Sequence, residues 1–194
     1  VMEVHATDDI RIAGTYFASI SGLIANTVRA VTPDTAQVKW LGTNMGVSVF
    51  DDADWTSLTD EDYLSSNQIT DIESDLTGLV HIGTRGGGVP RLRIDEVDGI
   101  TSASTINFWS SMPIDTVYTI HIDRNNVQWY GNGFGVFRHE GIDSKENWTG
   151  FQTTDGLIDN SVKSISEDAS GGMWFGTPSG VSFYDGADFE NFTE

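Results

Sequence analysis

Short apolar runs separated by glycine-containing turns recur along this chain. One element consists of an apolar run, Gly-Thr or a close variant, a few variable residues, a glycine and a second apolar run. It occurs at 38–47, 80–89, 127–136 and 173–181, with a weaker copy at 10–18. Runs of this length between turn-forming residues predict β-strands joined by tight reversals, and helical periodicity is almost absent.

A second pattern precedes each copy of this element. An apolar residue is followed three places later by another, and three places after that comes an Asp. The copies are Val28/Val31/Asp34, Ile69/Ile72/Asp75, Val117/Ile120/Asp123 and Val162/Ile165/Asp168, and the first unit has Val1/Val4 with Thr7 in place of Asp. Segments 75–78 and 168–171 begin with Asp and end with Gly, which suits a type I turn.

An aromatic residue followed three places later by another apolar one supplies a further strand in three units, and a similar pair is expected in a fourth. The pairs are Trp55/Leu58, Trp148/Phe151 and Phe189/Phe192, with Ile106/Trp109 expected to complete the set. Equivalent glycines, from Gly14 to Gly176, lie about 28, 41, 48 and 45 residues apart. A period of about 40 to 50 residues with four strands per unit is typical of a propeller blade.

The sequence therefore predicts an all-β protein, a β-propeller of about five blades. Each blade is expected to be a four-stranded antiparallel sheet, and the first is truncated because few residues are left for its outer strands. The whole chain, 1–194, is expected to form a single domain. The repeat units are approximately 1–26, 27–67, 68–115, 116–160 and 161–194.

Charge and composition narrow the classes of partner. The formal net charge of -19 would repel nucleic acid and anionic membranes. No apolar stretch approaches the roughly 20 residues of a membrane-spanning helix, so no membrane insertion is expected. The chain has no cysteine, which excludes disulfides, thiol catalysis and cysteine-based zinc sites. Cationic partners and divalent metals remain compatible with this charge.

Residues 160–181 carry the repeat in its fullest form. They contain Asn160 and Val162, the Asp168-x-x-Gly171 turn and Trp174-x-Gly176-Thr177-x-x-Gly180. This pattern resembles the two-component regulator propeller repeat. Two units depart from it, since His81 replaces the tryptophan of one and Asn132 replaces the threonine of another.

The resemblance implies a periplasmic or extracellular sensor domain of a bacterial hybrid histidine kinase. Propellers of this kind bind carbohydrate-like signals or mediate dimerisation. A similar propeller occurs in streptogramin-inactivating lyases, which use His and Glu with a metal. What carries over to this chain is the fold and a binding role.

The residues that follow each Gly-Thr pair vary from unit to unit while their frame is constant. Variable loops on a rigid frame are where scaffolds place binding residues. The candidates for contact with a carbohydrate or a protein ligand are Tyr16, Phe17, Asn44, Met45, Arg85, Phe134 and Ser179.

Other residues have a metal-binding or a structural interpretation. His5, Glu73 and His121 share one repeat position and could hold a divalent cation, or they could simply line a wet channel. His81 is expected to pack between blades, and His139 beside Glu140 is expected to be solvated. The remaining candidates are structural: the tryptophans Trp40, Trp129 and Trp174, packed between blades, and the glycines Gly42, Gly83, Gly131 and Gly176, whose φ freedom would serve the chain reversal.

The function that fits these observations is a non-enzymatic ligand- or protein-binding module. It would be the sensor segment of a two-component regulator, which presents its loops and a polar channel to a carbohydrate or a polypeptide and needs no cofactor. One alternative is a metal-dependent lyase or hydrolase that uses the His and Glu residues above. Another is a structural oligomerisation unit, in which the truncated first blade is completed by another copy of the chain.

Overall fold

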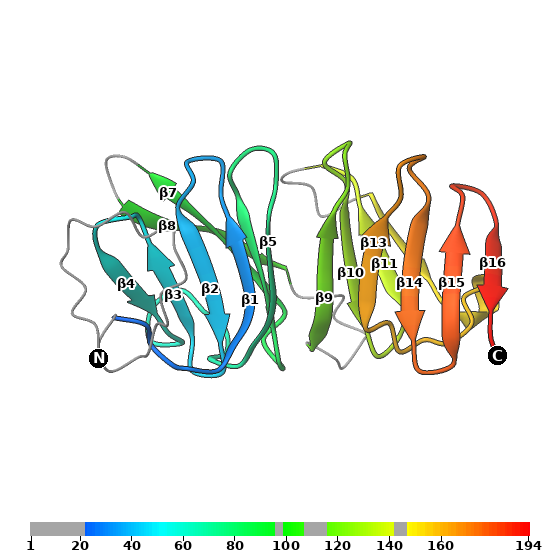
Figure 1. Cartoon of the computed structure of the whole chain (residues 1–194), viewed down its shortest axis with the longest axis horizontal. Coiled ribbons are helices and arrows are strands. Elements are labelled where there is room, and N and C mark those ends of the chain that lie inside the picture. The colour runs from blue at the N-terminus through cyan, green and yellow to red at the C-terminus, as the bar shows by residue number, and fades with distance from the viewer. Residues whose placement is uncertain (1–21, 96–98, 107–115, 142–146) are drawn as a thin grey trace.

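The structure is a computed structural model that describes residues 22–95, 99–106, 116–141 and 147–194. In these ranges sixteen strands form four antiparallel sheets of four strands, and within each sheet the strands follow the order of the chain (Figure 1). The prediction of an all-β propeller made of four-stranded antiparallel sheets is confirmed. Most of the truncated first unit, residues 1–21, lies outside the described ranges.

The four described sheets are named blades A to D. Blade A contains β1 (Val28–Pro33), β2 (Lys39–Thr43), β3 (Val47–Phe50) and β4 (Trp55–Leu58). Blade B contains β5 (Ile69–Ser74), β6 (Val80–Thr84), β7 (Val89–Asp95) and β8 (Gly99–Ile106). Blade C contains β9 (Val117–Ile122), β10 (Gln128–Asn132), β11 (Val136–His139) and β12 (Trp148–Phe151). A 3-10 turn, η1 (Thr153–Asp155), leads to blade D, with β13 (Ser164–Glu167), β14 (Met173–Thr177), β15 (Gly180–Tyr184) and β16 (Phe189–Phe192).

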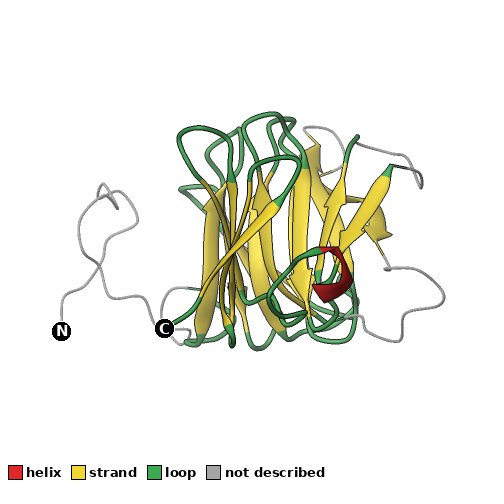
Figure 2. Ribbon diagram, turned by 90° about the vertical axis from the view of Figure 1, so that its right-hand side faces the viewer, coloured by secondary structure: helices red, strands yellow, loops and turns green. Residues whose placement is uncertain are grey.

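The blades pack side by side with their first strands innermost. Strand β5 lies against both β1 and β9, and β13 lies against β9. The outer strands β4 and β16 lie at the two ends of the row in Figure 1, and Figure 2 shows the sheets edge-on as a stack. Each inner blade therefore covers both of its faces with neighbouring sheets, which explains why its strands are apolar on both sides.

A β-bulge explains the spacing of the two apolar residues in each first strand. Residues three apart on a regular strand point to opposite faces of the sheet. The pairing of β5 with β6 shifts register between Ile69 and Asp71, and β1 shifts in the same way between Val28 and Ala30. The extra residue returns Ile69 and Ile72 to one face, where both join the same buried cluster.

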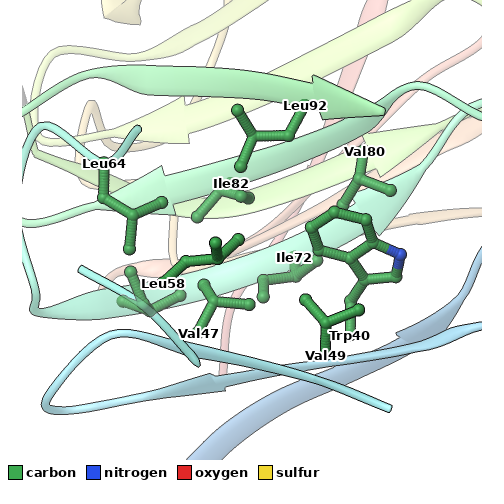
Figure 3. Close-up of a cluster of buried hydrophobic side chains, with 10 residues drawn as sticks. Trp40, Val47, Val49, Leu58, Leu64, Ile72, Val80, Ile82 and Leu92 are labelled. Atoms are coloured by element: carbon green, nitrogen blue, oxygen red, sulfur yellow. The ribbon is translucent and has the colours of Figure 1, made fainter. Parts of the chain in front are cut away.

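That cluster is the contact between blades A and B. Trp40, Val47 and Val49 of blade A meet Ile72 and other branched residues of blade B (Figure 3). Two further clusters repeat the arrangement along the row. One joins Val89 of blade B to Val117 and Ile120 of blade C, and the other joins Val136 of blade C to Val162 of blade D.

The Asp of each repeat holds the turn between the first and second strands. Oδ1 of Asp34 accepts hydrogen bonds from the backbone N–H groups of Ala36 (2.8 Å) and Val38 (3.1 Å). Its Oδ2 accepts one from Nε1 of Trp40 (3.0 Å). The same hydrogen bond, from Trp Nε1 to Asp Oδ2, recurs in the pairs Asp123–Trp129 and Asp168–Trp174, at 3.1 Å in both. One carboxylate thus fixes both the turn and the aromatic side chain on the next strand.

The first glycine of each Gly-Thr pair is needed for close approach rather than for its φ. A Cβ at Gly42 would lie 2.6 Å from Cγ2 of Ile69 in blade B, and one at Gly131 would lie 2.9 Å from Cγ1 of Val162 in blade D. Left-handed φ values occur instead at the second glycine of the element, such as Gly46 (φ 126°). The first glycine, which was expected to reverse the chain, therefore has another role: it leaves room for the side chains of the next blade.

The chain enters blades A and D by the same path. Segments 22–28 and 156–162 pass the outer strands of the sheet that they lead into, because the N–H groups of Ile24 and Ile158 donate to Ser48 and Ser182 on the third strands of those sheets. The preceding leucines, Leu23 and Leu157, are buried. Each connector thus closes one end of its blade.

The fourth strand of blade B differs from the sequence prediction. Ile106 was expected to begin it, but β8 ends there, and Ile106 pairs with Val89 as Leu58 pairs with Val47 in blade A. Ile106 therefore occupies the second apolar position of the aromatic-x-x-apolar segment, and Trp109 lies outside the described residues. The prediction was wrong because blade B has long third and fourth strands that shift the segment along the chain.

Replacing Trp40 by Phe is expected to destabilise the protein by about 2–3 kcal/mol, because it removes the donor to the buried Asp34 and leaves its Oδ2 without a partner. Trp174→Phe is the matched control, since Trp174 makes the same bond at an exposed site where water can replace it. Urea unfolding followed by circular dichroism measures both. Equal losses in the two variants would contradict the role given to the buried bond.

Gly42→Ala is expected to cost about 1–3 kcal/mol, because its methyl group would push against Ile69 across the blade contact. Gly133→Ala serves as the control: its φ is ordinary and its Cβ would meet only the Tyr118 side chain, at 3.4 Å from the hydroxyl. Thermal denaturation compares the two. A stable Gly42→Ala protein would show that the blades are not in tight contact at this point.

Candidate functional site

The turns between the second and third strands of the four blades lie at the same end of the sheets. We call them the turn face: residues 43–46, 84–88, 132–135 and 177–180, at the lower edge of Figure 1. The Asp turns lie at the opposite, upper edge (Figure 1). Because the four blades are adjacent, a ligand at this end could contact residues from several blades at once.

Each of these turns is held by its first residue. The hydroxyl group of Thr43 donates to the carbonyl of Gly46 (2.8 Å) and accepts from the N–H of Met45 (3.0 Å). Thr84 and Thr177 make equivalent bonds in blades B and D. In blade C, Oδ1 of Asn132 accepts from the N–H of Phe134 (2.7 Å), so the amide takes over part of the threonine's role. The frame of each turn is therefore fixed while its tip varies.

The structure brings five of the seven predicted ligand-binding residues to the turn face. The side chains of Asn44, Met45, Arg85 and Ser179 are exposed, and that of Phe134 is half-buried. Tyr16 and Phe17 lie outside the described residues. Exposed side chains of different chemistry on a fixed frame can form a specific contact surface.

Three of the turns are tied to the connectors that run beside them. The N–H of Arg85 donates to the carbonyl of Gln68 (2.9 Å), in the segment that precedes β5. Nε2 of Gln152 donates to the carbonyl of Phe134 (2.9 Å). Oγ of Ser179 donates to Oδ2 of Asp159 (2.5 Å), and this bond holds the pKa of the Asp159 carboxyl below its usual value. The connectors are therefore part of the turn face.

The turn face is rich in hydrogen-bond acceptors. The connector after β4 carries the exposed carboxylates of Asp60, Glu61 and Asp62, and the one after β12 carries Asp155 and Asp159. Carboxylates next to amide and hydroxyl groups accept hydrogen bonds from hydroxyl-bearing or cationic ligands.

Two cationic side chains lie at the same end as these carboxylates. One is Arg85, at the tip of the blade B turn, and the other is Lys163, which precedes β13. The ammonium group of Lys163 lies 3.3 Å from the centre of the Tyr118 ring, a cation–π contact between blades C and D. The face thus combines both charges with polar groups.

A second group of titratable residues lies on the innermost strands of blades B and C. Oδ2 of Asp71 accepts a hydrogen bond from the N–H of Ile120 (2.7 Å) and so joins the two blades. Burial raises the pKa of Asp71, and burial together with the Asp71 charge raises that of Glu73 to about 7. Burial lowers the pKa of His121, whose Nε2 has no hydrogen-bond partner among the described residues.

The proposed metal set is only partly covered by the structure. Glu73 and His121 lie on β5 and β9, at equivalent repeat positions, whereas His5 lies outside the described residues. Within the ranges that the structure describes, no group of three or more His, Asp or Glu side chains is arranged to hold a metal ion. The divalent-cation site therefore stays a hypothesis.

His81 occupies the place of the repeat's tryptophan and joins blades B and C. Its Nδ1 lies 2.9 Å from the Tyr130 hydroxyl and its Nε2 lies 3.4 Å from Oδ2 of Asp75. Burial lowers the pKa of the fully buried His81 ring. Burial alone would raise the pKa of Asp75, but hydrogen bonds from His81, Thr77 and the backbone hold it at about 2.

The expectation that His139 is solvated was wrong. Its ring is buried, stacks on Trp148 with 4.3 Å between ring centres, and has Nδ1 2.5 Å from Oε1 of Gln128. The error arose because Glu140, the next residue, is exposed while His139 pairs with Gln128 across the sheet. In an alternating strand, a charged neighbour says nothing about the face on which a side chain lies.

Sequence reasoning also missed a polar clamp between blades C and D. The guanidinium group of Arg124 contacts the Glu167 carboxylate and the carbonyls of Asp168 and Ala169. The backbone N–H of Arg124 donates to Oε2 of Glu167 (3.0 Å). The residue at this position differs from unit to unit, so the repeat pattern gave no signal for it. Arg124 fixes the Asp turns of two adjacent blades relative to each other.

The predicted structural residues occupy different environments. Trp40 and Trp129 are buried between blades, whereas Trp174 on blade D is exposed. Gly42, Gly83 and Gly131 each lie under a side chain of the following blade, whereas a Cβ at Gly176 would meet only Ser164 of its own blade. This difference shows that one face of blade D is not covered by another sheet in the described structure.

Comparison with known proteins supports the predicted resemblance. Residues 156–179 match the family described as two component regulator propeller. No curated protein sequence matches the chain. In the part of the chain that the structure describes, no helix has the length and apolar character needed to cross a membrane.

Solved structures with a similar fold include extracellular domains of two component systems. The extracellular domain of a hybrid two component system from B. thetaiotaomicron is 26% identical, with a TM-score of 0.75, and the match covers 86% of this chain and 23% of that one. A second such domain from the same organism is 20% identical, with a TM-score of 0.67, and the match covers 87% of this chain and 22% of that one. The chain thus spans about a quarter of the length of these proteins.

A virginiamycin B lyase from Staphylococcus aureus also has a similar structure. It is 16% identical, with a TM-score of 0.59, and the match covers 87% of this chain and 56% of the lyase. At this level of identity the similarity concerns the fold alone.

His81 is expected to make stability depend on pH. In the unfolded chain its pKa is about 6.5, but in the folded protein burial keeps the ring neutral, so the free energy of unfolding falls as the pH drops below about 6.5. Glu73 acts in the opposite direction, since its raised pKa favours proton uptake by the folded state between about 7 and 4.5. The test must therefore isolate the contribution of His81.

The contribution of His81 to the pH dependence is isolated by comparing the wild type with the His81→Gln variant. At pH 7.5 the variant is expected to be less stable by about 1–3 kcal/mol, because Asp75 and Tyr130 lose well-placed partners. The difference should shrink as the pH falls from 7.5 to 5.5 in urea titrations. A difference that does not vary with pH would show that His81 titrates normally in the folded protein.

Proposed function

We propose that this chain is part of an extracellular or periplasmic sensor propeller and that its turn face binds a carbohydrate or polypeptide ligand. The observation that carries the proposal is the turn face itself: four adjacent turns with fixed frames and variable, exposed tips. The similarity to extracellular domains of two component systems supports the compartment and the sensor role.

The chemistry of the turn face favours a hydroxyl-rich ligand. Its carboxylates, the Asn44 amide and the Arg85 guanidinium can form hydrogen bonds with adjacent sugar hydroxyl groups, and Met45 offers an apolar contact. A polypeptide with lysine or arginine residues is the other ligand that the acidic connectors favour.

Binding of this kind requires complementarity and no covalent chemistry. The threonine-held turns and the packed blades arrange the contact groups before the ligand arrives, which lowers the entropy lost on binding. The lyase alternative has support only from a fold shared at 16% identity. The binding module is therefore the function that we propose.

Binding can be tested on the 194-residue chain with an array of oligosaccharides and basic peptides, followed by thermal-shift titration of the compounds that bind. A bound ligand is expected to raise the melting temperature in a concentration-dependent way. Arg85→Ala and Asn44→Ala should each weaken binding about tenfold or more, because each removes a hydrogen-bonding group from the turn face.

Lys39→Ala is the matched control for Arg85→Ala. Lys39 is also a basic residue near the surface, but it lies at the opposite end of blade A, where its ammonium group contacts Asp52 (2.5 Å). Binding should survive this change. If no sugar or peptide binds, or if Arg85→Ala and Asn44→Ala bind as well as the wild type, the turn face is not the ligand site.

A further inference from the structure

The first strand of each blade carries one extra residue at its turn-face end, which we call the bulge residue. In blades A, B and C it is the residue that the β-bulge leaves out of the ladder, and the residue before it pairs with the first residue of the turn, as Val28 pairs with Thr43. In blade D the residue after it pairs with the first glycine of the Gly-Thr pair, as in blade A. The bulge residues are Arg29, Thr70, Tyr118 and Lys163. Bulges re-aim a side chain and are common beside functional sites.

Three of the bulge residues bridge neighbouring blades. The hydroxyl group of Thr70 donates to the carbonyl of Val117, the first residue of β9 (2.5 Å). The ring of Tyr118 lies under the ammonium group of Lys163, with 3.3 Å between that nitrogen and the ring centre. A Cβ at Gly133 would lie 3.4 Å from the Tyr118 hydroxyl oxygen, so this ring reaches the turn of blade C. The bulge residues therefore extend the turn face along its inner edge, where the first strands lie.

The bulge position is variable although its surroundings are constant. Each bulge residue follows a valine or isoleucine of the repeat, but the four bulge side chains are a guanidinium, a hydroxyl, a phenol and an ammonium group. Arg29 and Lys163 are exposed, and Thr70 and Tyr118 are half-buried. A constant frame with a variable side chain is the same feature that marks the tips of the turns as contact residues.

The basic bulge residues form no ion pair with a carboxylate in the part of the chain that the structure describes. This is unexpected in a chain with 29 acidic and only 10 basic residues. Other basic side chains of the described structure do contact a carboxylate: Lys39, Arg124 and Arg138. Arg29 and Lys163 therefore keep their charge available to a ligand, as does Arg85 at the tip of the blade B turn.

Carboxylates near the inner edge are occupied by contacts within the protein. Asp71, which follows a bulge residue, accepts hydrogen bonds from the N–H groups of two isoleucines, at 2.9 and 2.7 Å. Asp159 accepts from the N–H of Ser161 (2.8 Å) and from Oγ of Ser179 (2.5 Å). The exposed acidic residues 60–62 directly follow β4, the outer strand of blade A. The inner edge of the turn face is therefore basic, and its outer edge is acidic.

We infer that the bulge residues bind anionic groups of the ligand, and that this ligand is an acidic oligosaccharide, a sugar chain with carboxylate or sulfate groups. The inference rests on the proposed function and selects among its ligands. The Arg29 guanidinium suits two parallel hydrogen bonds to a carboxylate or sulfate, and Lys163 supplies a point charge. The acceptors of the outer edge bind sugar hydroxyl groups. A basic polypeptide would be repelled by the inner edge, and a neutral sugar would leave its cations without partners.

Isothermal titration calorimetry of the 194-residue chain tests this with sugars matched in length: trigalacturonic acid, a sulfated galactotriose and neutral galactotriose. At least one of the two acidic sugars is expected to bind about tenfold or more tightly than the neutral one, because charged hydrogen bonds are stronger than neutral ones. Added sodium chloride should reduce this preference, since salt screens exposed charges. The two acidic arms distinguish a carboxylate ligand from a sulfate ligand.

Variants that remove one charge each assign the preference to the bulge residues. Arg29→Gln and Lys163→Gln should each weaken binding of the acidic sugar about tenfold and leave binding of the neutral sugar unchanged, whereas Lys163→Arg should retain the preference. Lys39→Gln is the matched control, because Lys39 lies at the opposite end of blade A. Circular dichroism checks that each variant is folded, which is expected because Arg29 and Lys163 are exposed.

Three results would overturn the inference and leave the proposed function intact, provided that Asn44→Ala still weakens binding. The first is equal affinity for acidic and neutral sugars. The second is an acidic preference that survives both Arg29→Gln and Lys163→Gln, and the third is binding of basic peptides in place of acidic sugars. If neither sugars nor basic peptides bind, the inference and the proposed function both fail.

Discussion

The packing of each first strand on the second strand of the preceding blade is the contact on which the rest of the structure depends. It requires a residue without a side chain at Gly42 and its equivalents, since the branched residues of the next blade occupy the space that a Cβ would need. It also requires a bulge that turns two apolar residues, three apart, to one face. Sheets held in this way stack in a row, and the turns of successive blades are brought to common ends.

Polar groups define how the blades are aligned once they are in contact. The turn Asp binds both its own turn and the tryptophan of the next strand, and Asp71 reaches across to a backbone N–H of blade C. Between blades B and C the tryptophan is replaced by His81, which satisfies Asp75 and Tyr130 together. Such groups are costly to bury without partners, so they specify one arrangement of the sheets among several that hydrophobic packing alone would allow.

The two ends of the sheets have different roles. The Asp turns close one end through internal bonds and through the Arg124 clamp, which commits the polar groups there to contacts within the protein. At the other end, Thr43 and its equivalents hold the frames of the turns and leave the tips exposed. A rigid frame with variable tips suits recognition.

The sequence by itself determined the repeat, the number of strands in each of the four described units and the position of the variable turn residues, because these depend on local spacing and turn chemistry. It could not determine which side of a strand is buried at His139, the displaced fourth strand of blade B or the clamp made by Arg124. Those depend on which residues meet across sheets. Only the tertiary structure decided that Trp40 is buried while Trp174 is exposed, since the two share one motif and differ only in whether another blade lies against them.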